Sequence, residues 1–233
     1  MFEELLYPTF VAISPDEVLK RHDAIIGKYG MGVFLKRREF QRAREMYQTA
    51  RYAIGMTAKT DNIYWVTPAR KEDQTPDTYI LWADNVSKKI NIECVEVTLW
   101  EEHQDDLFTI ISKKIKKSYP YYFVILVHAE RPREYIESKY FADIIKRLKT
   151  YKITAGAVRF WMPIEKGEKD TLIGELYPLD NYTTFRTSYF IKKYDRLSQK
   201  IIKVDVISGR VFFKPSQKDV EMVLPDLPEL TDY

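Results

Sequence analysis

The sequence has little cysteine, little excess charge of either sign and no long apolar run. Its single cysteine, Cys94, excludes an internal disulfide and a zinc site built on several cysteines. No apolar run approaches the roughly 20 residues that span a bilayer. The first ten residues lack the basic-then-apolar order of a secretory signal. We therefore expect a cytoplasmic protein without a membrane partner.

The composition is that of a globular protein. Hydrophobic residues make up 45% and charged residues 30% of the 233 positions, which argues against a disordered or fibrous chain. The formal charge of +3 is too small to indicate a nucleic-acid-binding protein by itself. The length suffices for one large core with extensions.

Hydrophobic periodicity divides the chain into three segments. We expect an N-terminal helical extension over 1–35, an α/β core over 36–162, and a β-rich C-terminal extension with an acidic tail over 163–233. Ser14-Pro15-Asp16-Glu17 is typical of a helix start. A second helix is predicted over Lys36–Met56, and residues 36–60 hold seven basic and two acidic side chains. Its predicted inner face consists of Phe40, Ala43, Tyr47, Ala50 and Ile54.

The core segment alternates between strand and helix patterns. Strands are predicted at Ile63–Thr67, Thr78–Ala83, Lys89–Trp100, Tyr121–Val127 and Ile153–Met162, and helices at Asp105–Ser118 and Glu134–Lys149. The continuously apolar Tyr121–Val127 indicates a central strand buried on both faces. Later strands are predicted at Leu172–Tyr177, Ser188–Tyr194, Ile201–Ile207 and Val211–Lys214, the last two as a hairpin. We expect an α/β fold whose mixed central sheet is flanked by helices.

Two acidic residues lie on consecutive predicted strands. Asp77 follows Pro76, and Glu96 begins Glu96-Val97-Thr98. An even-numbered loop near 84–87 places Asp77 opposite residue 92 or 94 and makes Glu96 a diagonal neighbour on the same face. A slip of one residue sends the two acids to opposite faces. Paired buried carboxylates favour a cation such as Mg²⁺.

This order of elements resembles the PD-(D/E)XK nuclease superfamily, which has the restriction-endonuclease-like fold, over about residues 36–162. The resemblance implies Asp77 and Glu96 as ligands of Mg²⁺ or Mn²⁺, with Glu39 as an accessory acid. Thr98 stands where the family has a lysine two residues after the glutamate. Some members carry that lysine on the following helix, and here Lys114 falls within the apolar face of Asp105–Ser118.

The resemblance implies a metal-dependent endo- or exonuclease that hydrolyses phosphodiester bonds, with DNA as the expected substrate. Asp77, Glu96, Lys114 and Glu39 are the candidate catalytic residues. Nucleic-acid phosphates are expected to contact Arg37, Arg38, Arg42 and Arg44. The alternative is a non-catalytic nucleic-acid-binding or protein-assembly module on a degenerate nuclease fold, and a homodimer is a further open question.

Each candidate also has a purely structural interpretation. Asp77 can simply begin a strand, and Glu96 can face solvent from a one-sided sheet. Lys114 can extend along an apolar surface, and Glu39 can pair with Arg42 on its own helix. The basic helix can be a solvated face. His128 follows the buried strand and is kept as a minor candidate, because ligands bind at the ends of such sheets.

Overall fold

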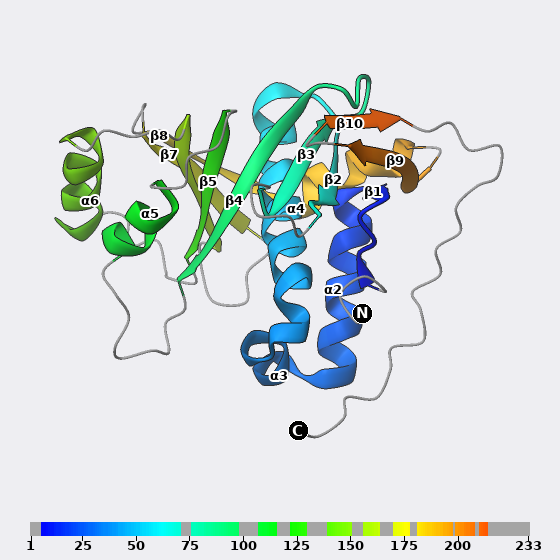
Figure 1. The fold of residues 1–233 in the computed structure, drawn as a ribbon, viewed down its shortest axis with the longest axis horizontal. Coiled ribbons are helices and arrows are strands. Elements are labelled where there is room, and N and C mark those ends of the chain that lie inside the picture. Colours follow the sequence, from blue (N-terminus) through cyan, green and yellow to red (C-terminus); the bar gives the residue numbers. More distant parts are fainter. Residues whose placement is uncertain are drawn as a thin grey trace.

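A computed structural model describes residues 6–70, 76–97, 107–115, 122–129, 139–150, 156–163, 170–177, 181–197, 199–207 and 210–213. Ten strands form one sheet in the order β10-β9-β1-β2-β3-β4-β5-β6-β7-β8 (Figure 1). Strands from all three predicted segments therefore belong to the same sheet. Among the described residues, no helix combines the length and apolar character needed to cross a membrane.

The N-terminal part is mostly helical. It comprises β1 (Val11–Ile13), α2 (Pro15–Tyr29), α3 (Met31–Lys36), the 3-10 turn η1 (Arg38–Phe40) and α4 (Gln41–Thr60). The helix start at Ser14-Pro15 is confirmed, since Ser14 is the N-cap of α2. The basic helix begins later than predicted because Arg37 is extended, with φ −83° and ψ 136°, and separates α3 from η1. Its predicted inner face holds, with Phe40, Ala43 and Ala50 buried.

The central part contains the predicted alternation of strands and helices. Its elements are β2 (Tyr64–Pro68), β3 (Thr78–Trp82), β4 (Lys89–Val97), α5 (Leu107–Ile115), β5 (Phe123–Ala129), α6 (Lys139–Thr150) and β6 (Ala157–Pro163). β4 pairs with β5, and β5 with β6, in parallel, as the predicted strand-helix-strand unit requires. The side chains Phe123–Leu126 are fully or almost fully buried, which confirms the central strand.

The C-terminal part differs from the prediction at one element. It comprises β7 (Asp170–Tyr177), β8 (Asn181–Arg186), α7 (Thr187–Ile191), the 3-10 helix η3 (Lys192–Arg196), β9 (Ile201–Ile207) and β10 (Arg210–Phe213). The strand predicted at Ser188–Tyr194 is wrong, because these residues are helical. Packing against α4 explains the difference: the buried Tyr194 hydroxyl hydrogen-bonds Thr57 Oγ1 at 2.9 Å. The predicted β9–β10 hairpin is confirmed.

Helices lie on both faces of the sheet, which confirms the predicted fold class. α4 packs against β2, β3, β4 and β6 on one face, and α2 packs against α4. On the other face α5 contacts β4 and β5 (Figure 1). Several predictions lie outside the described residues: Thr98, the strand and helix ends at Trp100, Asp105, Ser118, Tyr121, Glu134, Ile153 and Lys214, and the acidic tail after Lys218.

Candidate metal and catalytic site

The register of β3 and β4 determines which acids meet. Thr78 pairs with Ile92, and the Asp77 N–H donates to the Ile92 carbonyl at 2.9 Å. Asp77 is therefore opposite Glu93. Because side chains alternate along a strand, Asp77 and Glu93 share one face of the sheet. Cys94 and Glu96 point to the other face, toward α4.

Lys114 of α5 joins these two acids. Its Nζ lies 3.1 Å from Asp77 Oδ2 and 2.8 Å from Glu93 Oε2. The Glu93 side chain is fully buried, whereas those of Asp77 and Lys114 are 20% and 24% exposed. The Cys94 N–H donates to the same Asp77 Oδ2 at 2.7 Å. Asp77, Glu93 and Lys114 are called the acid–lysine cluster below. The prediction that Lys114 faces inward, toward a carboxylate, is confirmed.

The cluster carries more negative than positive charge when both acids are ionised. Burial raises the pKa of Asp77, and the neighbouring Glu93 raises it further, while the Lys114 ammonium offsets part of that effect. Both carboxylates raise the pKa of Lys114 despite its burial. We therefore treat Lys114 as firmly protonated, and the Asp77 carboxyl as easier to protonate than an ordinary aspartate. A second cation would relieve the remaining repulsion between the two carboxylates.

Glu96 does not join Asp77, so the predicted shared face is wrong. Trp82 and Lys88 pair at the ends of the two strands and enclose the loop 83–87, which has an odd number of residues. The prediction assumed a loop with an even number of residues. This shift of one residue turns Glu96 toward α4, where its Oε2 lies 3.2 Å from Arg44 Nε. Glu93 is the acid that sequence reasoning missed. The sequence did contain a signal for Glu93. It is an acid within an apolar strand, and the next helix has a lysine on its inward face.

The remaining predicted residues lie elsewhere. Glu39 is partly exposed in η1 and makes no hydrogen bond or ion pair within the described part of the chain. Arg42 is buried and donates to the Tyr7 carbonyl at 3.1 Å. Arg44 Nη1 donates to the carbonyls of Phe34 and Arg37. Both guanidinium groups donate to main-chain carbonyls instead of being presented outward for the phosphate contacts predicted for Arg42 and Arg44. Arg37 is half-buried and Arg38 is exposed.

His128 is part of the protein interior. Its ring stacks on that of Trp161 with centroids 4.0 Å apart and an interplanar angle of 6°. Burial, together with the charges of Arg51 and His22, lowers the pKa of His128 to about 3. The imidazole is therefore neutral near pH 7. The ring is thus packed in the core, and its buried Nδ1 has no hydrogen-bond partner among the described residues.

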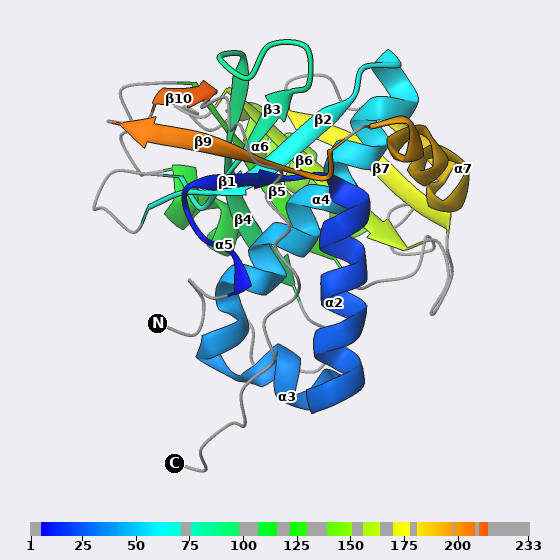
Figure 2. The ribbon, with the colours of Figure 1, turned by 90° about the vertical axis from the view of Figure 1, so that its right-hand side faces the viewer.

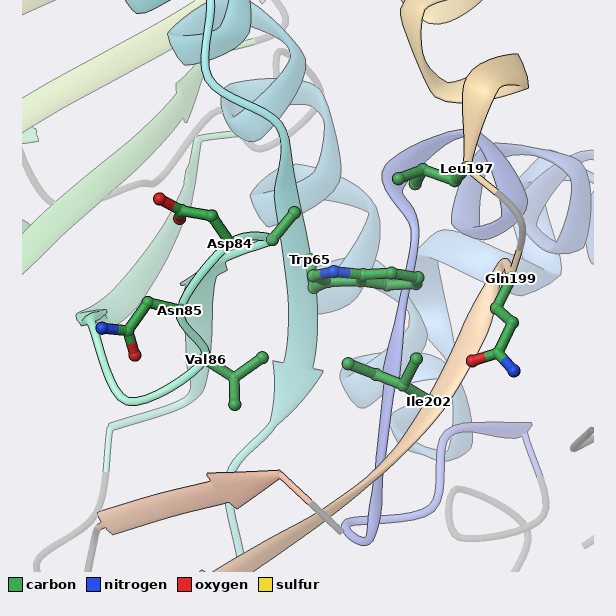
Figure 3. Close-up of a pocket in the computed structure, with 8 residues that line it drawn as sticks. Trp65, Asp84, Asn85, Val86, Leu197, Gln199 and Ile202 are labelled. Atoms are coloured by element: carbon green, nitrogen blue, oxygen red, sulfur yellow. The ribbon is translucent and has the colours of Figure 1, made fainter. Parts of the chain in front are cut away.

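A hollow of about 480 Å³ lies on the sheet around Trp65. Val86, Leu197 and Ile202 surround the indole, while the polar ends of Asp84 and Asn85 point away from it (Figure 3). The lining near the ring is thus apolar, and the acid–lysine cluster contributes no residue to it. We assign this hollow no part in the chemistry of the cluster.

The carboxylates of Asp77 and Glu93 are the best candidates to hold a metal ion. Mg²⁺ is often bound through one or two carboxylates and keeps several waters, so two acids suffice. Among the described residues, no group of three or more histidine, cysteine, aspartate or glutamate side chains is arranged to hold a metal. Comparison with protein-family models, curated proteins and solved structures gives no match for this chain. The chemistry of the site therefore depends on the contacts above.

Proposed function

We propose that this protein is a metal-dependent nuclease that hydrolyses phosphodiester bonds, with DNA as the first candidate substrate. The observation that carries the proposal is the position of Lys114 Nζ, 3.1 Å and 2.8 Å from carboxylates on adjacent strands. A protonated amine beside paired acids combines metal ligands with a group that stabilises negative charge.

Each member of the cluster has a distinct role in this proposal. Asp77 and Glu93 would hold Mg²⁺ or Mn²⁺, which when bound would supply an activated water and neutralise phosphate charge. The Lys114 ammonium would stabilise negative charge that develops on the phosphate oxygens. The Cys94 N–H holds Asp77 Oδ2, which fixes the direction of the carboxylate.

The corrected register changes which residues would match the PD-(D/E)XK motif. Glu93 takes the position of the motif glutamate in place of Glu96. Val95, which is 3% exposed, then stands where the family has lysine. The lysine comes instead from α5, the helix that follows the glutamate strand, as in some members of that superfamily. The residue that the motif lacks is thus replaced in space by Lys114.

A non-catalytic nucleic-acid-binding or assembly module is the second candidate. The Lys114 ammonium favours this candidate, because it already contacts both acids and can stabilise them without a metal. In that case the cluster contributes to stability alone. The two proposals differ in whether the wild type cleaves nucleic acid at all.

The test is cleavage of supercoiled plasmid, linear duplex and single-stranded DNA, and of RNA, in Mg²⁺ and in Mn²⁺. Asp84→Asn is the matched control, because Asp84 is an exposed aspartate in the β3–β4 loop. The nuclease proposal predicts that wild type and Asp84→Asn cleave at least one of these substrates, whereas Asp77→Asn is at least 100-fold slower. Absence of cleavage by the folded wild type would favour the module, whereas equal cleavage rates for the two variants would refute the role of Asp77.

A further inference from the structure

The helices α2, α3 and α4 form a projection whose outer end lies away from the sheet (Figures 1 and 2). Residues Lys28–Arg38, called the basic tip below, occupy this end. Two apolar side chains are exposed there: Met31 at 48% and Val33 at 37%. A solvent-exposed methionine and valine at the end of a projection suggest a surface that contacts a partner.

The basic tip has charge of one sign. No acidic residue occurs between Asp23 and Glu39, whereas Lys28, Lys36, Arg37 and Arg38 are basic. Lys36 and Arg38 are exposed and make no ion pair within the described part of the chain. Their charges are therefore available to a polyanion.

Glycine in the basic tip has no packing explanation within the described structure. Gly32 lies inside α3, and a Cβ at this position would have no atom within 4 Å. Glycine in a helix is less favourable than alanine. Its lack of a side chain would instead allow a partner to approach the main chain closely. Gly30 differs, since its φ of +82° itself favours glycine.

Arg44 connects the basic tip to the strand that carries Glu93. Its Nη1 donates to the Phe34 carbonyl at 2.7 Å and to the Arg37 carbonyl at 3.0 Å. Its Nε lies 3.2 Å from Glu96 Oε2 at the end of β4. Glu96 lies three residues after Glu93 on β4 and faces the opposite side of the sheet, so this bridge fixes the basic tip to the strand that carries Glu93.

We propose that the basic tip binds the sugar-phosphate backbone of the nucleic acid, and that the Arg44–Glu96 bridge positions it relative to the acid–lysine cluster. Lys36 and Arg38 contact phosphates, Gly32 allows close approach of the backbone, and Met31 and Val33 contact sugars. This inference rests on the proposed function for the identity of the partner. Phosphate contacts of this kind position nucleic acid without reading its sequence.

The test measures binding of fluorescently labelled duplex and single-stranded DNA in EDTA, so that cleavage does not interfere. The variant Lys36→Gln/Arg38→Gln is compared with Lys146→Gln/Lys192→Gln, which removes two exposed lysines of α6 and η3. Each phosphate contact contributes about 0.9 to the slope of log affinity against log salt. We expect the slope of the tip variant to become shallower by the contribution of about two phosphate contacts. The control variant should keep the slope of the wild type.

Gly32→Ala gives a second, independent readout. It should raise the melting temperature, because alanine favours helix, yet weaken DNA binding by crowding the contact surface. Unchanged salt slope and affinity in both tip variants, or no DNA binding by wild type, would overturn the inference. Tip-dependent binding to anionic phosphatidylserine vesicles without DNA binding would also overturn it, in favour of a membrane surface. DNA binding through the tip without cleavage by wild type would instead refute only the nuclease proposal.

Discussion

Asp77, which directly precedes β3, and Glu93 of β4 lie on one face of the sheet, and Lys114 reaches both of them from α5. The two acids come from strands separated by a short loop, so the length of that loop decides their meeting. The lysine comes from the element that follows. Strand register therefore brings the two acids together, and the inward face of α5 brings Lys114 to them.

Replacing Lys114 by methionine should destabilise the fold strongly. It leaves two carboxylates near each other, one fully buried, without their cation. Removing one partner of such a buried pair costs about 3–5 kcal/mol. The loss should shrink as pH falls, because protonation of Asp77, whose folded pKa is already raised and rises further without the ammonium, removes the repulsion. Urea unfolding at pH 7 and pH 5 measures both effects.

Lys113→Met is the control for that experiment, since Lys113 is exposed on the same helix. It should change the unfolding free energy by less than about 1 kcal/mol. Equal losses for the two lysines, or a Lys114→Met deficit that does not change with pH, would contradict the electrostatic account of the cluster.

The fold itself was largely accessible from sequence, because β5 is a continuously apolar run and the flanking helices show a strong hydrophobic period. The site was accessible only in part. The spacing of apolar residues directs Lys114 inward whatever the register, so this residue was found. Glu93 and Glu96 differ by three positions and hence by face, and their assignment depended on the parity of the loop 83–87. Sequence alone did not determine that parity.

The missed C-terminal helix has a different cause. Ser188–Tyr194 has the aromatic composition of a strand, but Tyr194 packs through its hydroxyl on Thr57, more than a hundred residues earlier. Such long-range contacts override local propensity. A long-range contact also explains the burial of Arg42, which donates a hydrogen bond to the Tyr7 carbonyl.

His128 should make the fold sensitive to acid. Its folded pKa of about 3 lies below the ordinary value of 6.5, because burial and the charges of Arg51 and His22 disfavour the imidazolium. As pH falls below 6.5, His128 therefore binds a proton in the unfolded chain but not in the folded protein. The free energy of unfolding decreases between about pH 6.5 and pH 3. This loss amounts to about 2 kcal/mol at pH 5.

His128→Phe keeps a ring on Trp161 and removes the titration. The decrease in unfolding free energy between pH 7 and pH 5 should be smaller in this variant by about 2 kcal/mol. Parallel pH profiles for wild type and variant would show that His128 is not the group responsible.

Gly55→Ala should destabilise the protein although alanine favours helix. A Cβ at Gly55 would lie 2.7 Å from Ile173 Cδ1 and 2.7 Å from Phe185 Cε1, which belong to the core beneath α4. Overpacking of this kind costs about 1–3 kcal/mol. Gly27→Ala in α2 is the contrast, because no atom lies within 4 Å of its Cβ position. Thermal melting should show a decrease for the first variant and a slight increase for the second.

The most direct test of the account compares Glu93→Gln with Glu96→Gln in thermal melting with and without Mn²⁺. A ligand that binds the native state alone stabilises it by about 2.7 kcal/mol at 100 times its dissociation constant. We predict that millimolar Mn²⁺ raises the melting temperature of wild type and Glu96→Gln, and leaves that of Glu93→Gln unchanged. Equal shifts in both variants, a shift lost only in Glu96→Gln, or no shift in wild type would contradict a metal site at Asp77 and Glu93.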